Sequence, residues 1–227
     1  MNRELLLRGI LKFTKRWDDH WVIRFQAMKG KNNPAPAIFN NLINLYTEPS
    51  REYHNIEHVN ECLEEFDGMR GLYLVRHTLV MKMALIHHDA ICVPGRNGNE
   101  EKSNDLMRAN MEALGFVPWA IDAASDLVLV SNPLVIPKAG DEFYMRDIDF
   151  SIFGKPWERY ERYMKGIRRE YGHVSDEDFK KGRMDFLGEC LNKSSNSGLF
   201  YTDYFKNKYE MQARDNIKKE IAILESC

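Results

Sequence analysis

The sequence predicts an all-α protein, a helical bundle of about eight to ten helices. Apolar residues recur with the 3.6-residue spacing of a helix in nearly every segment, and no segment shows convincing period-2 alternation. Asparagine, proline and aspartate stand at the expected starts of these segments, where they can cap or open a helix. The one strand-like run, residues 126–131, continues a helical pattern and does not change the prediction.

Short polar or proline-containing stretches separate the predicted helices. Asn55 can cap one helix, and Ser175 with Asp178 resembles a capping box at the start of another. Each boundary is expected to hold within about 2–4 residues. The predicted helices cover about residues 3–28 with a break near Trp17, 37–47, 56–66, 72–91, 99–114, 118–130, 141–153, 156–171, 176–192 and 203–225.

Composition and charge are those of an ordinary globular protein. Hydrophobic residues make up 44% of the chain and charged residues 29%. A net charge of -2 argues against non-specific electrostatic binding to nucleic acid or to a membrane surface. No apolar run approaches the roughly 20 residues of a membrane span, and the first residues lack the uninterrupted apolar stretch of a signal peptide. We therefore expect a cytoplasmic protein without membrane or nucleic-acid partners.

The organisation of the chain indicates one domain. The sequence contains no internal repeat, no low-complexity segment and no linker-like stretch. We expect a single domain over residues 1–227, in which helices of residues 1–48 pack on a core of about residues 49–225. The four cysteines have no C-x-x-C spacing and are expected to be free thiols. The sequence leaves the oligomeric state open.

Two histidines and an aspartate close the most apolar of the predicted helices, in the run ALIHHDAICV at residues 84–93. His88 follows Ala84 by four residues and Leu85 by three, so it lies on the buried stripe of the helix. A carboxylate at Asp89 is costly to bury unless something pairs with it, and a divalent metal is one such partner. The alternative is a hydrogen bond between His88 and an exposed Asp89.

Two further segments carry metal-capable side chains at informative positions. His54 and His58 are four residues apart, so both can point towards one spot if a helix begins near Asn55. Asp149 has apolar residues at i−4, i+3 and i+4, which places it on an apolar face. Asp147 lies about 200° around the same helix, so the two aspartates cannot face one ion directly. Asp147 is then a solvated residue or a supporting partner of the site.

These residue types together indicate a catalytic metal. Imidazole and carboxylate ligands suit Mn, Fe, Co, Ni or Zn better than Ca. An ion in such a site keeps positions open for water and substrate, lowers the pKa of the bound water and neutralises oxygens of a phosphate ester.

Histidine, histidine–aspartate and aspartate, in this order on an all-helical chain, resemble the HD superfamily of metal-dependent phosphohydrolases. The resemblance is to a group described as predicted metal-dependent HD phosphohydrolases, and it covers about residues 45–220. The matching segments are YTEPSREYHNIEHV, ALIHHDAICV, NEEKSND, RDIDFSIFG, YERYMKGIRREY and FKKGRMDFL. The resemblance implies an HD-domain-like helical bundle that hydrolyses a nucleotide or another small phosphorylated metabolite.

The same resemblance implies a role for each matching residue. The implied metal ligands, for a Mn, Fe, Co, Ni, Zn or Mg ion, are His58, His88, Asp89 and Asp149, the last favoured over Asp147 by its register in Ile148-Asp149-Phe150. The implied catalytic residues are Glu100, His54 and Asp89, and the candidate substrate-binding residues are Arg51, Tyr53, Asn55, Arg168 and Arg183.

The arginine in the last of these segments has a structural alternative. Arg183 lies inside the apolar stripe of its helix, where a buried guanidinium needs a carboxylate or a phosphate. A structural ion pair with an acid such as Glu100 or Asp147 would satisfy it equally well.

One departure from the group affects the function. Ser131 and Leu134 stand where the group often has a T-x-x-H segment, so a histidine that could bind a second metal or the substrate is missing. This favours one metal over two, or a changed substrate. Two other functions stay open: a diiron oxygenase of the HD type, and a non-catalytic regulatory module that binds a nucleotide or a metal. His77 is about 16 Å from His88 along the predicted helix, too far to share a diiron site with it.

Overall fold

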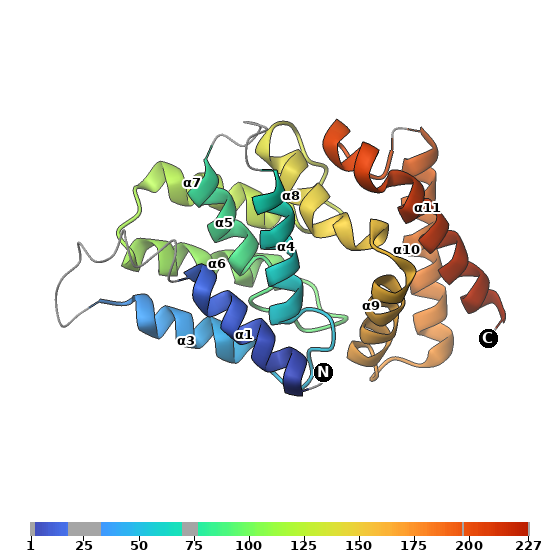
Figure 1. Cartoon of the computed structure of the whole chain (residues 1–227), viewed down its shortest axis with the longest axis horizontal. Coiled ribbons are helices and arrows are strands. Elements are labelled where there is room, and N and C mark those ends of the chain that lie inside the picture. Colours follow the sequence, from blue (N-terminus) through green and yellow to red (C-terminus); the bar gives the residue numbers. More distant parts are fainter. Residues whose placement is uncertain (1–2, 18–32, 70–76, 197, 227) are drawn as a thin grey trace. The chain divides into compact units, whose positions relative to one another are not determined.

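The computed structural model describes residues 3–17, 33–69, 77–196 and 198–226. Within these residues it contains ten α-helices, one 3-10 helix and no strand, which confirms the all-α prediction (Figure 1). The elements are α1 (Arg3–Trp17), α3 (Ala35–Tyr46), α4 (Ile56–Gly68), α5 (Thr78–His87), α6 (Asn99–Ala113), α7 (Pro118–Leu129), α8 (Asp141–Asp149), η2 (Phe150–Gly154), α9 (Trp157–Glu170), α10 (Asp176–Asn196) and α11 (Asp203–Ser226).

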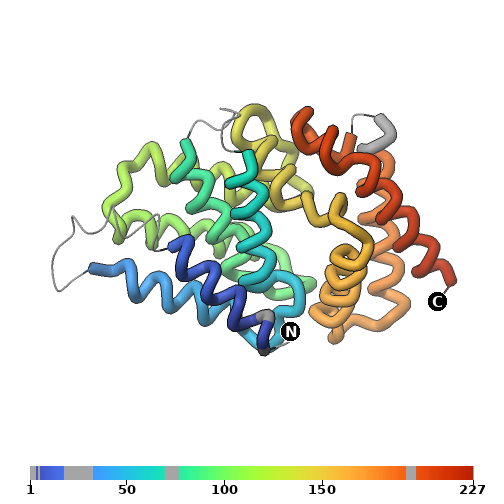
Figure 2. The backbone as a smooth tube through the Cα atoms, viewed as in Figure 1, coloured from blue at the N-terminus to red at the C-terminus, as the bar shows by residue number. Residues whose placement is uncertain are grey.

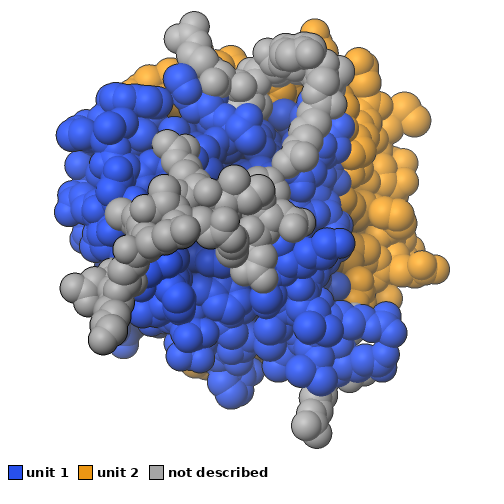
Figure 3. Space-filling view, turned by 60° about the vertical axis from the view of Figure 1, so that its left-hand side comes forward, with its two compact units in different colours: residues 1–135 blue, residues 136–227 orange. Residues whose placement is uncertain are grey.

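The chain divides into two compact units, Met1–Val135 and Ile136–Cys227, which Figure 3 colours separately. The backbone trace of Figure 2 runs through α1 and α3 to α7 in the first unit and through α8 to α11 in the second. The expectation of a single domain over residues 1–227 stays a prediction.

The first unit is built around α5. This helix contacts α4, α6 and α7, and all eight residues from Val80 to His87 are buried. A helix that is buried on every side must be apolar on all its faces, which is why this segment is rich in apolar residues. Lys82, the lysine within it, is paired with Asp67, with 3.0 Å between Nζ and Oδ1.

The second unit depends on a close approach between η2 and α11. Asn216 of α11 donates from its side-chain amide to the carbonyl oxygens of Phe153 and Lys155, at 2.8 Å each. Gly154, between them, faces the side chain of Tyr209, and a Cβ atom at this position would collide with that side chain. A glycine is therefore required where the 3-10 helix ends.

Several predicted boundaries hold and others are wrong. Asn55 caps α4 as predicted, because its side chain accepts a hydrogen bond from the backbone N–H of Glu57 at 2.8 Å. Helix α5 ends at His87, four residues before the predicted end at residue 91, so that Asp89 lies in the turn that follows. The predicted helix at 141–153 ends at residue 149 and continues as η2.

Parts of two predicted helices, residues 18–28 and 72–76, lie outside the described residues. In the described part of the chain, no helix is both long and apolar enough to cross a membrane.

We predict that Gly154→Ala destabilises the protein by about 1–3 kcal/mol, because the new methyl group overpacks the contact with Tyr209. Chemical unfolding followed by circular dichroism measures the change. Gly182→Ala is the matched control: Gly182 is exposed within α10 and a Cβ there meets nothing within 4 Å. This control should gain about 0.5–1 kcal/mol from the better helix propensity of alanine. Equal stability of Gly154→Ala and the parent protein would contradict the close packing of η2 on α11.

Candidate metal centre

Three side chains of the first unit bring metal-capable atoms together at the end of α5. Nε2 of His58, from the first turn of α4, lies 3.1 Å from Nε2 of His88. Oδ2 of Asp89 lies 3.0 Å from Nε2 of His88 and 3.3 Å from Nε2 of His58. Both histidines are buried, and Asp89 keeps a 20% exposed side chain. The structure therefore brings three of the four predicted metal ligands into one small triangle.

Local structure explains why these atoms meet. The cap at Asn55 starts α4 at Ile56, which puts His58 in the first turn of a helix that packs against α5. His88 is the C-terminal cap of α5, and its backbone N–H still bonds to the carbonyl of Ala84 at 2.9 Å. The chain then turns, and Asp89 points back towards the two imidazoles.

The protonation of His88 follows from its second nitrogen. Nδ1 lies 2.9 Å from the carbonyl oxygen of Leu85, which can only accept, so the proton of neutral His88 sits on Nδ1. Nε2 then presents a lone pair to Oδ2 of Asp89 at 3.0 Å. Two acceptors this close repel each other unless a proton or a cation lies between them. A backbone carbonyl that fixes the imidazole tautomer is also the usual support of a metal-bound histidine.

The spacing of the triangle fits a divalent metal. Metal–ligand bonds of about 2.0–2.1 Å place neighbouring ligand atoms about 2.8–3.0 Å apart in octahedral geometry and about 3.3–3.4 Å apart in tetrahedral geometry. The three separations, 3.0, 3.1 and 3.3 Å, lie within this range. The donor set of two imidazoles and a carboxylate is suited to Mn, Fe, Co, Ni or Zn.

The charge at Asp89 also favours a cation. Burial raises the pKa of Asp89, but His88 and His54, when their imidazoles are protonated and charged, and hydrogen bonds with protonated His58 and His88 outweigh it, so the pKa lies well below its usual range. Asp89 is therefore ionised at neutral pH and supplies negative charge to the site.

His54 and Tyr53 border the triangle on the side of the α4 cap. The ring of Tyr53 lies 4.9 Å from the ring of His54 and 4.8 Å from that of His58, measured between centroids. His54 is half-buried and its ring lies 6.2 Å from that of His58. His54 is thus a neighbour of the site with access to solvent.

Cys62 is a member of this cluster that the sequence analysis treated only as a free thiol. It follows His58 by four residues and so lies on the same face of α4, a spacing that could have been noticed. His58, Cys62 and His88 offer ligand atoms within 4.8 Å of one another and form a buried group that could hold a metal ion.

The position of the sulfur makes Cys62 a poorer ligand than Asp89. Sγ lies 3.7 Å from Nε2 and 3.8 Å from Nδ1 of His58, so it is on the lone-pair axis of neither nitrogen. A metal bound in line with Nε2 would lie about 4 Å or more from this sulfur, well beyond a metal–sulfur bond of about 2.3 Å. Cys62 must rotate about its Cα–Cβ bond before it can ligate. Cys62, Cys92 and Cys190 are free thiols, as predicted, and Cys227 lies outside the described residues.

The two aspartates of α8 have different roles within the second unit. Asp147 is fully buried and accepts hydrogen bonds from the backbone N–H groups of Tyr201 and Thr202, at 2.8 Å each, and from the hydroxyl of Thr202 at 2.7 Å. It therefore holds the segment that enters α11. Asp149, the last residue of α8, is half-buried. The ligand role of Asp149 stays a prediction.

All three arginines predicted to bind substrate are bonded to protein groups. Arg168 donates to the carbonyls of Tyr171 and Val174 and to the carboxylate of Asp176. Arg183 forms a buried, two-point salt bridge with Glu220, with distances of 2.8 and 3.2 Å. This is the structural ion pair foreseen as the alternative, with Glu220 as the acid in place of Glu100 or Asp147.

The third arginine, Arg51, is buried beside the candidate centre. It donates to the carbonyl oxygens of His54, Asp89 and Ala90 at 3.1, 2.6 and 2.8 Å. Its Nε also lies 3.2 Å from a carboxylate oxygen of Glu48.

The remaining predicted positions lie at several places in the first unit. Glu100 is in the first turn of α6, one turn before Ser103, whose hydroxyl bonds to the backbone of Ile91 just after the candidate centre. Glu100 thus belongs to the helix face that packs towards this region. Leu134, where a histidine was missing, is 87% exposed.

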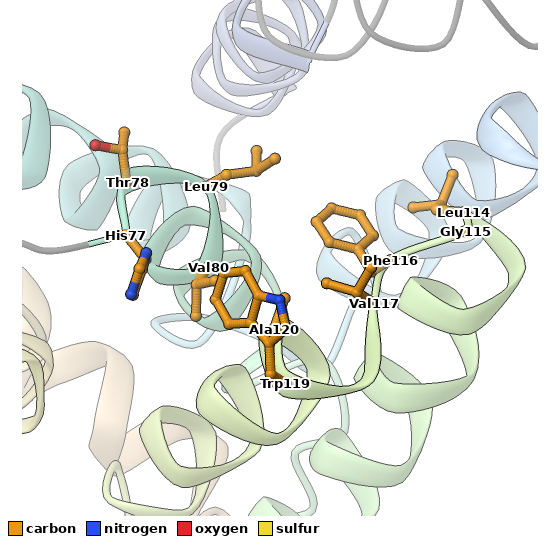
Figure 4. A pocket seen from close by; sticks show the side chains of 10 residues that line it. All are labelled: His77, Thr78, Leu79, Val80, Leu114, Gly115, Phe116, Val117, Trp119 and Ala120. Carbon is orange, nitrogen blue, oxygen red and sulfur yellow. The ribbon is translucent and has the colours of Figure 1, made fainter.

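His77 lies at the opposite end of α5 from His88. It lines a cavity of about 360 Å³ together with residues of α7, and its ring lies 5.0 Å from that of Trp119 (Figure 4). His87 instead bonds to the carbonyl of Met83 and to the amide of Asn110, at 2.8 and 3.0 Å, within the core. Burial lowers the pKa of His87 to about 4, so its ring is neutral.

Comparison of the chain with models of known protein families, with curated proteins and with solved structures finds no match. The HD resemblance therefore stays an expectation based on the motifs alone.

We predict that Glu220→Ala destabilises the protein by about 3–5 kcal/mol, because it leaves the guanidinium of Arg183 buried without its partner. Denaturant unfolding measures the loss. Glu225→Ala, an exposed position on the same helix, should change stability by no more than about 0.5 kcal/mol. Similar effects of the two substitutions would mean that the salt bridge is not a buried structural pair.

We also predict that the protein binds a divalent ion and that His88→Ala lowers the affinity by about 100-fold or more, since it removes a ligand rather than a supporting group. Calorimetric titration of the chelator-treated protein with Zn²⁺, Mn²⁺ and Co²⁺ measures this. His173→Ala, at an exposed histidine of the second unit, should leave the affinity unchanged. Equal affinities of the two variants would exclude His88 as a ligand.

Proposed function

We propose that this protein is a metal-dependent phosphohydrolase that acts on a nucleotide or another small phosphorylated metabolite. The observation that carries the proposal is the contact between His88 Nε2 and Asp89 Oδ2. These two atoms lie 3.0 Å apart, Nε2 of His58 lies 3.1 Å from Nε2 of His88, and the side chain of Asp89 is 20% exposed. The HD resemblance supplies the reaction class and the substrate class.

The proposed ligands within the first unit are His58, His88 and Asp89, and the resemblance adds Asp149 as the fourth. A divalent ion held there would lower the pKa of a bound water and neutralise charge on a phosphate ester. Asp89 has a further role because it is the one member of the triangle with appreciable exposure. Its carboxylate lies where water and substrate would enter.

Two neighbouring groups are proposed to handle protons. His54 is half-buried beside the triangle and has a side chain that titrates near neutral pH when unperturbed. It would orient the attacking water or the substrate. Glu100, on the α6 face near Ile91, is the proposed general base. Tyr53 would line the entrance next to His54.

A second candidate function is a non-catalytic module that binds a metal or a nucleotide. One observation favours it: the three arginines predicted to hold phosphate all donate to carbonyls or carboxylates of the protein itself. A hydrolase needs positive charge for the substrate, whereas a sensing module needs only the bound ion.

The deciding experiment is a hydrolysis screen of the protein purified without chelator. Nucleoside mono-, di- and triphosphates are tested with added Mn²⁺, Co²⁺, Ni²⁺, Mg²⁺ or Zn²⁺, and release of phosphate or pyrophosphate is measured. Asp89→Ala should lower the rate by about 1,000-fold or more, equivalent to several kcal/mol of lost transition-state stabilisation. Asp149→Asn should lower it to a similar extent if the fourth ligand is correctly assigned.

Asp185→Ala, at an exposed position of α10, is the control and should retain full activity. Unchanged hydrolysis in Asp89→Ala would overturn the proposal. One bound metal per chain without turnover of any compound in the panel would favour the non-catalytic module. Two bound irons and a visible absorption band would favour the diiron oxygenase instead.

A further inference from the structure

We infer that Arg51 is a positioning residue that fixes the geometry of the metal centre, and that it does not bind the phosphate of the substrate. The inference rests on the metal site of the proposed function and reverses the role that the sequence predicted for this arginine. Arg51 stands in the segment between α3 and α4, and its side chain is 4% exposed.

The hydrogen bonds of Arg51 join the two segments that carry the ligands. One donor group, Nη1, reaches the carbonyl of His54, just before the cap of α4, and also the carbonyl of Asp89. The other, Nη2, reaches the carbonyl of Ala90. The first segment leads directly into the turn of α4 that presents His58, and the second contains Asp89 itself. One planar group thus sets the distance between the backbones of the ligands.

A planar guanidinium is required for this arrangement. Its donors are fixed in a fork, whereas the ammonium of lysine is a single point that cannot reach several carbonyls in one plane. Three carbonyls and the Glu48 carboxylate already engage four of its five N–H groups. A phosphate would have to displace buried carbonyls, each of which is costly to leave unsatisfied.

The charge of Arg51 is balanced within the protein. Glu48 lies 3.2 Å away, and the guanidinium lies over the ring of Tyr46, 5.4 Å from the centroid. Tyr46 is itself fully buried and donates to the carbonyl of Ile86, near the end of α5, at 2.9 Å. A cation so close to a metal site would repel the metal if it were unpaired, and these contacts reduce that repulsion.

The two roles of Arg51 make opposite predictions for Arg51→Lys. If Arg51 positions the ligands, the substitution lowers metal affinity by about 10–100-fold, the usual effect of losing a supporting partner of a ligand. Catalysis then recovers when the metal concentration is raised. If Arg51 binds phosphate, metal affinity is unchanged and KM for the substrate rises. Calorimetric titration of the chelator-treated protein and steady-state kinetics at saturating metal separate the two.

Arg168→Lys is the matched control. Arg168 also donates to two backbone carbonyls and a carboxylate and lies over an aromatic ring, that of Phe179, but it belongs to the second unit. It should lose stability without a change in metal affinity. This comparison distinguishes positioning of the metal from a purely structural effect of breaking such a clamp.

A second variant covers the case in which Arg51→Lys does not fold. Glu48→Gln keeps Arg51 in place but removes the charge that balances it, and it should lower metal affinity by a smaller factor than Arg51→Lys. Unchanged metal affinity in both folded variants would overturn the inference while leaving the proposed function intact. Failure of the parent protein to bind any divalent ion would overturn both.

Discussion

The contact between Nε2 of His88 and Oδ2 of Asp89 is the constraint on which the candidate centre depends. In neutral His88 both atoms are acceptors, since the carbonyl of Leu85 holds the proton on Nδ1. Two acceptors 3.0 Å apart repel each other unless a proton or a metal cation lies between them. The fold nevertheless holds the two atoms there, by the end of a buried helix on one side and by Arg51 on the other. A second proton on His88 makes this arrangement favourable, and a divalent cation bound by both atoms does so as well.

The burial of α5 explains how the contact is maintained. A helix that is packed on every side cannot rotate or slide without breaking the contacts of its neighbours α4, α6 and α7. His88 is its C-terminal cap, so the position of its ring is fixed by the core. The turn after the helix is held by the bonds from Arg51 to the carbonyls of Asp89 and Ala90 and by those between Ser103 and the backbone of Ile91.

Interactions that are local in the sequence were predictable, and those between distant residues were not. The cap at Asn55 and the position of His58 in the first turn of α4 follow from residue type and spacing, and the structure confirms the cap. The end of α5 at His87 was missed because the carbonyl of Ile86, which a longer helix would use, accepts from Tyr46, and the carbonyls of Asp89 and Ala90 accept from Arg51, about forty residues earlier in the chain. The helical periodicity of this segment does not reveal these distant partners.

The partners of the buried charged groups were also unpredictable, because they are distant in the sequence. Asp147 bonds to Thr202 and Arg183 to Glu220, partners separated by 55 and 37 residues. Spacing placed Arg183 on an apolar face and so predicted that it needs a partner, whereas Asp147 was left as a solvated residue or a supporting partner of the site. The choice of partner depends on tertiary packing, which a single sequence does not reveal. The sequence could therefore state the need of Arg183 for an anion but could not decide between a carboxylate and a phosphate.

The arginines that the sequence analysis assigned to substrate are bonded within the protein, and this affects how a phosphate could be bound at the site. Each guanidinium predicted to hold phosphate instead holds backbone or a carboxylate. A phosphate in the first unit would then meet the charge of the bound ion before that of any of these arginines. Binding of substrate would depend on the ion as strongly as hydrolysis does, because the charge of the ion would both attract the phosphate and stabilise the transition state. An enzyme of this kind gains its affinity for substrate only when the metal is in place, and Arg51 would influence both through the position of Asp89.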